Sequence, residues 1–120
     1  IEIICVEQIK FNIDKFKVKA GEPIELILIN KTDMPHNLVI TKPGNYKEVG
    51  AASIDMLSDP KAADKHYVPD LDSVITSTYV VQPKGSHTLY FVAPSNAGDY
   101  PFLCTFPGHW QLMKGIMQVE

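Results

Sequence analysis

The residues with the clearest metal chemistry lie close together near the end of this 120-residue chain. Cys104, His109 and Met113 place a thiolate, an imidazole and a thioether within ten residues, and a Pro-Gly turn separates the first two. Two imidazoles and one thiolate in a plane, with a weak axial thioether, form a ligand set that proteins use for copper in electron transfer. The segment therefore offers three of the four donors of such a site.

The second imidazole has to come from another part of the chain. His36 lies in a Met-Pro-His-Asn sequence, at a point where a loop is predicted to enter a strand. Soft sulfur combined with imidazole selects copper over calcium or magnesium, which prefer oxygen ligands. A structural zinc site is expected to use four Cys and His ligands without a thioether. The donor types therefore favour copper, with His36 as the candidate for the second imidazole.

Short strand-like segments make up most of the chain and would have to position these donors. They recur at short intervals with turn residues between them, which is typical of an all-β sandwich. The exception is the segment 46–69, whose composition suits one or two short helices with a break at Asp59-Pro60. The expected strands are 1–6, 11–18, 24–29, 37–41, 76–81, 88–92, 99–104 and 115–119.

Length and charge exclude several classes of protein. At 120 residues and 45% hydrophobic content, one globular domain spanning 1–120 is expected. The 14 acidic and 11 basic residues give a net charge of −3, and every basic residue is a lysine, which disfavours nucleic-acid binding. No apolar run approaches the ~20 residues that a membrane helix needs.

The ligand segment also resembles a known family. Cys104-Thr-Phe-Pro-Gly-His109, followed by Leu112-Met113-Lys-Gly, closely resembles the copper-binding loop of azurins, which are cupredoxins (blue, type 1 copper proteins). Four residues separate Cys104 from His109 and three separate His109 from Met113, as in azurins, whereas plastocyanin and amicyanin have shorter Cys-to-His spacings. The resemblance covers most of the chain from about residue 33 onward and implies the Greek-key β-sandwich of the cupredoxin fold. The other matching segments are 34–37, Met56, 67–70 and 72–75.

The resemblance implies a role for each matching residue. Cys104 corresponds to the thiolate ligand, His36 and His109 to the equatorial imidazoles, and Met113 to the long axial ligand of one copper ion. Asn37 resembles the asparagine that ties the loop of the first histidine to the ligand loop and directs its N–H at the cysteine sulfur. Its implied partner is Thr105, and Phe106 keeps an N–H that could donate a second bond to the sulfur.

Three departures from azurins affect these expectations. Pro35 stands where azurins have glycine, as in plastocyanin, so its carbonyl is expected to contact the metal more weakly. Cys5 has no second cysteine nearby, so the azurin disulfide is expected to be absent and Cys5 to be a small buried residue. Leu38 replaces the buried tryptophan of azurins, and the only tryptophan is Trp110, directly after a ligand.

The implied function is one-electron transfer by a mononuclear site that cycles between Cu(I) and Cu(II), through His109, in a carrier rather than an enzyme. Two alternatives stay open: an electron-relay domain of a larger copper or dehydrogenase enzyme, and a copper-binding module without redox duty. A complete copper oxidase is disfavoured because only His66 and His87 remain for further copper sites, and both are expected to be exposed.

The expected partner is a redox protein such as a c-type cytochrome or a dehydrogenase. In this family an exposed apolar patch around the second histidine is where partners dock, and exposed apolar patches generally mark interaction sites. The chain begins at Ile1 without a signal peptide, so it is expected to be a processed mature form or a domain of a longer protein. The resemblance implies a periplasmic or cell-surface location. The predicted patch consists of Met34, Pro35, Phe106, Pro107, Trp110 and Leu112.

Overall fold

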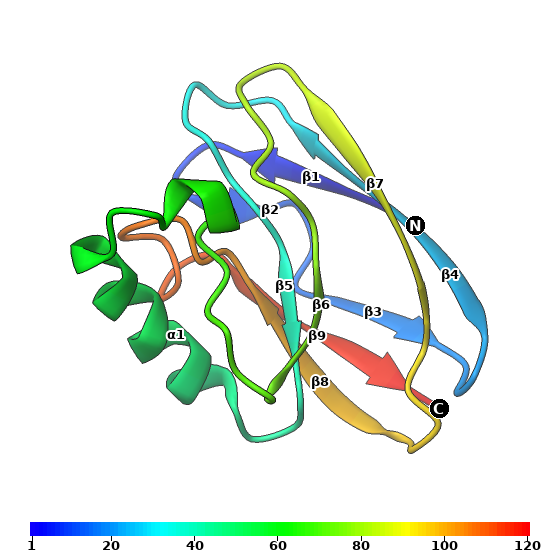
Figure 1. Cartoon of the computed structure of the whole chain (residues 1–120). Helices are drawn as coiled ribbons and strands as arrows, with labels where there is room; N and C mark the ends of the chain where they lie inside the picture. Colours follow the sequence, from blue (N-terminus) through cyan, green and yellow to red (C-terminus); the bar gives the residue numbers. More distant parts are fainter.

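Nine strands form two sheets that face each other in the computed structural model, which describes residues 1–120 (Figure 1). The pairs β1–β4 and β3–β9 are parallel and all other pairs are antiparallel. Neighbours within each sheet are mostly distant in sequence, so the chain crosses repeatedly between the two sheets, as predicted for a Greek-key sandwich. The first sheet contains, in order, β2 (Lys10–Phe11), β1 (Glu2–Val6), β4 (Pro23–Asn30) and β7 (Ser86–Val92). The second contains, in order, β3 (Lys15–Val18), β9 (Lys114–Val119), β8 (Gly98–Leu103), β5 (Val39–Thr41) and β6 (Val74–Ser77).

Alternation of side chains along the strands builds the core between the sheets. In β4, Ile24, Leu26 and Leu28 are buried while Pro23 and Glu25 are exposed, because successive strand residues point to opposite faces. The fully buried Phe102 of β8 lies at the centre, with its ring centroid 5.4 Å from that of Phe11 and 5.5 Å from that of Phe16. Because these aromatic residues come from both sheets, they hold the sheets together.

The segment 11–18 does not form the single strand that was expected. It divides into the end of β2, in the first sheet, and β3, in the second. The division comes at Asn12, whose side-chain Oδ1 accepts the N–H of Ile4 in place of its main-chain carbonyl, while its own N–H still donates to Ile4 O. Because the side chain takes the second bond, the ladder with β1 ends here, and the chain then crosses to the other sheet.

The strand expected at 76–81 lies earlier in the chain, at Val74–Ser77. After this strand, Val81 forms an isolated antiparallel β-bridge with His36. The N–H of Val81 donates to His36 O at 2.7 Å and the N–H of His36 donates to Val81 O at 3.2 Å. This bridge fixes the backbone of His36 just before β5 begins.

The helical insertion predicted at 46–69 is confirmed. It contains α1 (Tyr46–Asp55) and two short 3-10 helices, η1 (Met56–Ser58) and η2 (Ala63–Lys65). The first helical run stops before Asp59-Pro60, because proline disfavours a helical residue ahead of it. Val49 of α1 packs on Val39 and Leu103, so the helix lies against the second sheet. None of the helices has the length and apolar character needed to cross a membrane.

Candidate metal centre

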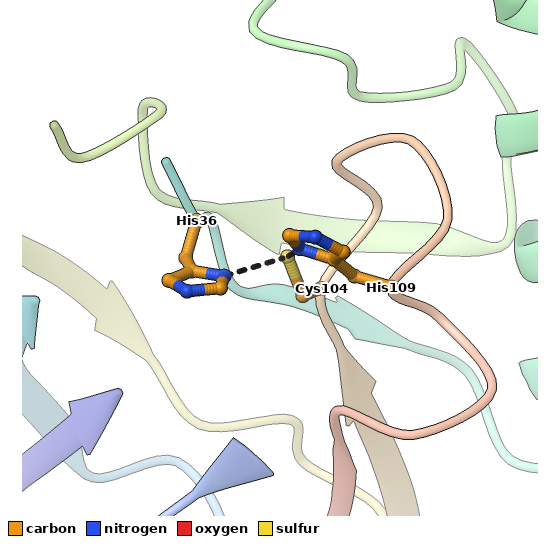
Figure 2. A group of neighbouring side chains, drawn as sticks. All are labelled: His36, Cys104 and His109. Carbon is orange, nitrogen blue, oxygen red and sulfur yellow. Dashed lines mark hydrogen bonds between the residues drawn. The ribbon is translucent and has the colours of Figure 1, made fainter. Parts of the chain in front are cut away.

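Three donor side chains from distant parts of the sequence meet in one buried place. His36 precedes β5, Cys104 follows β8, and His109 lies on the loop after it, and their ligand atoms all lie within 4.8 Å of one another. Cys104 Sγ is 3.9 Å from Nδ1 of His36 and 3.7 Å from Nδ1 of His109. Figure 2 shows both imidazole rings beside the sulfur. The structure therefore brings together the thiol and both imidazoles that were predicted.

Met113 is held beside these donors by its main chain. Its carbonyl accepts the N–H of Cys104 at 3.0 Å, and its own N–H donates to His109 O at 2.9 Å. The side chain is fully buried in the main core. All four predicted ligands therefore belong to one buried region at the end of the sandwich.

The loop between the donors is a tight turn. The N–H of His109 donates to Phe106 O at 3.1 Å, and the intervening Gly108 has a φ of +85°. This left-handed conformation favours glycine because it places no Cβ against the backbone. The Pro-Gly pair seen in the sequence thus returns the chain so that His109 faces Cys104.

Asn37 ties the loop of the first histidine to the ligand loop, as expected. Its main-chain N–H donates to Cys104 Sγ at 3.5 Å. Its side chain accepts the N–H of Thr105 at 2.8 Å and donates to Thr105 Oγ1 at 2.9 Å. Asn37 and Thr105 are both fully buried, so this pair fixes the two loops without competition from water.

Two main-chain carbonyls complete this network and were not predicted. Asn37 Nδ2 donates to His66 O at 2.9 Å, and Thr105 Oγ1 donates to Tyr67 O at 2.6 Å. His66 and Tyr67 have φ values of +52° and +57°, which are unusual for non-glycine residues and follow directly after η2. No side-chain pattern could have revealed these acceptors, since every residue carries a carbonyl.

Thr32 is a further contact of the site that sequence reasoning missed. Its Oγ1 lies 2.9 Å from Nε2 of His36, the ring nitrogen that faces away from the sulfur. The same hydroxyl lies 2.8 Å from Asn30 Oδ1 and 3.1 Å from Met34 O. Partners of this kind orient metal-binding imidazoles, so Thr32 holds the His36 ring with Nδ1 toward Cys104.

Burial sets the protonation of the three donors. It lowers the pKa of His36 to about 4, with a further contribution from neighbouring His109, and it also lowers the pKa of His109. Burial raises the pKa of the Cys104 thiol to about 12, against the opposing effect of the N–H groups of Asn37 and Phe106. The imidazoles are therefore neutral and ready to bind a metal, while the thiol gives up its proton when a metal binds.

The low pKa of His36 predicts that the metal-free protein loses stability in acid. In the unfolded chain this imidazole binds a proton near pH 6.5, but in the folded protein only near pH 4. The buried neutral imidazole therefore contributes fully to the free energy of unfolding above pH 6.5. This contribution, about 3 kcal/mol, is lost as the pH falls from 6.5 to 4. Urea unfolding of metal-free protein at a series of pH values measures this loss, and His36→Gln is expected to remove most of it. A free energy of unfolding that is flat across this range would contradict the assignment.

The prediction for the remaining cysteine is confirmed, whereas the prediction for the two remaining histidines is not. Cys5 is free and buried, as predicted. His66 and His87 were expected to be exposed, and this is wrong because both are half-buried. Their rings stack on Tyr79 with centroid distances of 4.5 Å and 4.7 Å, which covers part of each imidazole.

The predicted docking patch is exposed unevenly. Met34 and Leu112 are 39% and 58% exposed, whereas the other four patch residues are half-buried. His109 keeps 5% of its surface exposed, while His36 keeps none. Trp110 faces α1 rather than open solvent, because its ring packs directly against Gly50. Among the six patch residues, Met34 and Leu112 therefore present the most free apolar surface.

The donor set fits copper better than other common metals. A thiol and two neutral imidazoles converge in a buried site with a buried thioether residue alongside, and the donor group contains no carboxylate. Soft sulfur and imidazole ligands suit copper, whereas calcium and magnesium require oxygen. The residues present therefore match a type 1 copper site.

Comparison with known proteins agrees with this assignment. Residues 4–120 match the profile of the family described as copper-binding proteins, plastocyanin/azurin family. The chain is 36% identical to azurin-1 of Alcaligenes xylosoxydans xylosoxydans over 108 residues, which cover 88% of this chain and 78% of that protein. It is 28% identical to auracyanin-A of Chloroflexus aurantiacus over 116 residues, covering 95% of this chain and 69% of the relative.

Solved structures give the same result. The structure of reduced auracyanin from Roseiflexus castenholzii superimposes with a TM-score of 0.85 and 33% identity, covering 99% of this chain and 94% of that one. Auracyanin A of Chloroflexus aurantiacus, described as a blue copper protein, superimposes with a TM-score of 0.86 and 27% identity, covering 100% and 97% of the two chains. The sequence, the fold and the buried donors together show that the chain belongs to the plastocyanin/azurin family of copper-binding proteins.

Proposed function

We propose that this protein is a one-electron carrier in which His36, Cys104, His109 and Met113 hold a single copper ion. Bound copper supplies the chemistry by alternating between Cu(I) and Cu(II). The observation that carries the proposal is the convergence of one buried thiol and two buried imidazoles, with their ligand atoms within 4.8 Å of one another. Azurins and auracyanins are electron carriers rather than enzymes, which supports the same reading.

The protein's own contribution is to keep the donors from moving when the charge at the site changes. Thr32 fixes the ring of His36, and the Asn37–Thr105 pair locks the loops that carry His36 and Cys104. Preorganised ligands supported by hydrogen bonds have little to rearrange when an electron arrives or leaves. This rigidity is what an electron carrier requires.

Copper loading and redox titration test the proposal directly. Protein given one equivalent of Cu(II) is expected to turn intensely blue through charge transfer from the Cys104 thiolate. It should then accept one electron per chain, lose its colour, and regain the full spectrum on reoxidation. A protein that binds copper without colour, or that cannot be cycled reversibly, would leave a sequestering module as the better description.

The exchange surface is proposed to include the exposed side chains of Met34 and Leu112, which lie two and three residues from the ligands His36 and His109, and the edge of His109 that stays exposed. A redox protein such as a c-type cytochrome is the proposed partner. Redox encounters use small, transient interfaces, and a patch of a few apolar side chains suits that class.

Leu112→Asp is expected to slow electron exchange with a purified c-type cytochrome by about tenfold, because a charge on the patch opposes desolvation by roughly 1.4 kcal/mol. The blue absorption band should stay unchanged, since Leu112 is 58% exposed. Stopped-flow absorption measures the rate. Leu57→Asp is the matched control, because Leu57 is 62% exposed on η1 and outside the patch. Equal rates for the two variants would remove Leu112 from the exchange surface.

The protein is proposed to work outside the cytoplasm. Azurin-type relatives are secreted periplasmic proteins, which supports a periplasmic or cell-surface location. Fractionation of the producing cells, with detection of the chain by antibody, tests the location.

A further inference from the structure

Trp110 follows the proposed ligand His109, and its indole ring lies so close to Gly50 that a larger residue would not fit at position 50. A Cβ placed on Gly50 of α1 would lie 2.1 Å from Cε3 and 2.4 Å from Cδ2 of the indole ring. Glycine inside a helix costs about 1 kcal/mol relative to alanine, and Gly50 sits in the middle of α1. The close approach of Trp110 explains why position 50 is a glycine despite this cost.

A hydrogen bond reinforces the same contact. Tyr46, the first residue of α1, donates its hydroxyl to the main-chain carbonyl of Trp110 at 2.7 Å. The two aromatic rings lie 5.4 Å apart between centroids, and Lys114 Nζ lies 5.3 Å from the centroid of the Tyr46 ring. Helix α1 therefore contacts Trp110, which follows His109, and Lys114, which follows Met113.

The helix is in turn fixed to the strand that leads to Cys104. Val49 packs on Leu103, the residue before Cys104, and both are fully buried with Val39. In Figure 1 the orange loop after β8 lies beside α1. The helix thus touches the chain next to three of the four proposed ligands.

We propose that α1 is a clamp that sets the position of the ligand loop, with Trp110, Tyr46 and Gly50 as its positioning residues. This inference rests on the proposed copper site and adds that an element outside the sandwich helps to determine its geometry. Between His109 and Met113 the loop itself has only turn hydrogen bonds, so an external contact is needed to hold it. Met113 would hold copper only weakly, because a thioether is a weak ligand, so its position would depend on the protein rather than on the metal.

Two variants test the clamp. Gly50→Ala forces the indole ring away from α1, and Tyr46→Phe removes only the hydrogen bond to Trp110. Both are expected to change the EPR spectrum of the Cu(II) protein and to lower copper affinity roughly tenfold or more, measured by chelator competition. Trp110 is the only tryptophan, so its fluorescence reports the contact in the metal-free protein. Gly50→Ala should shift that emission to longer wavelength.

Tyr100→Phe is the matched control. Tyr100 donates its hydroxyl to the carbonyl of Asn96 at 2.8 Å, so this variant loses the same kind of bond away from the ligand loop. It should leave the EPR spectrum, copper affinity and Trp110 emission as they are. In a Trp110→Leu background, Gly50→Ala should have little additional effect, because the ring that it displaces is gone.

The outcomes separate the clamp from the copper proposal. Folded Tyr46→Phe and Gly50→Ala proteins with the parental EPR spectrum and copper affinity would overturn the clamp while leaving the copper site intact. A parental protein that never turns blue would defeat the proposed function instead, and Trp110 emission would still report the contact with α1. Should Gly50→Ala fail to fold, Tyr46→Phe decides the question alone.

Discussion

Cys104→Ser is expected to abolish the blue colour of the copper-loaded protein. The absorption arises from charge transfer out of the thiolate, and a serine hydroxyl neither ionises at neutral pH nor donates a soft electron pair. Copper affinity should fall at least a hundredfold, because losing a ligand costs more than losing a supporting hydrogen bond. Absorption spectroscopy during Cu(II) titration, with chelator competition for affinity, measures both effects.

Cys5→Ser is the matched control for this substitution. Cys5 is also fully buried and free, but it lies in β1 within the main core, and the three-residue donor group does not include it. The variant should keep its blue colour while losing about 1–3 kcal/mol of stability, since its hydroxyl enters an apolar environment. A blue Cys104→Ser protein, or a colourless Cys5→Ser protein, would show that the thiolate ligand has been assigned to the wrong cysteine.

Asn37→Ala is expected to destabilise the metal-free protein by about 3 kcal/mol. The side chain makes three hydrogen bonds, to the N–H of Thr105, to Thr105 Oγ1 and to the carbonyl of His66. Each net bond contributes about 1 kcal/mol, and buried groups left without partners add to the loss. Urea unfolding gives the free energy, and faster copper release from the variant would show that the loops no longer hold the donors together.

Asn12→Ala separates this effect from the general loss of an asparagine. Asn12 also accepts a main-chain N–H, that of Ile4 at 2.8 Å, but in an exposed position where water can replace it. Its loss should cost no more than about 1 kcal/mol and should leave copper release unchanged. Equal costs for the two variants would mean that the buried network adds nothing to the stability of the loops.

The strands could largely be predicted, while their assignment to sheets could not. Alternating and β-branched segments mark β1, β4, β7 and β9 because the pattern is a local property of a half-buried strand. The division at Asn12 was missed, since the same local pattern fits a continuous strand. β2 ends where the N–H of Ile4, eight residues away in the sequence, donates to the side chain of Asn12 rather than to its main chain.

The kind of metal and the turn that presents the ligands could both be predicted from residue types and their spacing. Within Cys104–Met113 the donors are separated by a few residues and one Pro-Gly turn, so their spacing alone restricts how they can meet. The donor types predict the metal, because a thiolate with imidazoles and a thioether suits copper. Residue types alone made His36 only a candidate, the resemblance to azurins assigned it as a ligand, and the fold brings its Nδ1 to 3.9 Å from the Cys104 sulfur.

The contacts that hold the donors in place depend on the folded structure. The carbonyls of His66 and Tyr67 are main-chain groups that every residue possesses, and Thr32 has an ordinary hydroxyl until the fold brings it to His36. The fit of Trp110 over Gly50 joins residues 60 positions apart, and no local pattern relates them. The ligands can be predicted from residue type and local spacing. The hydrogen bonds and packing that hold them in place come from segments that meet only after the chain has folded.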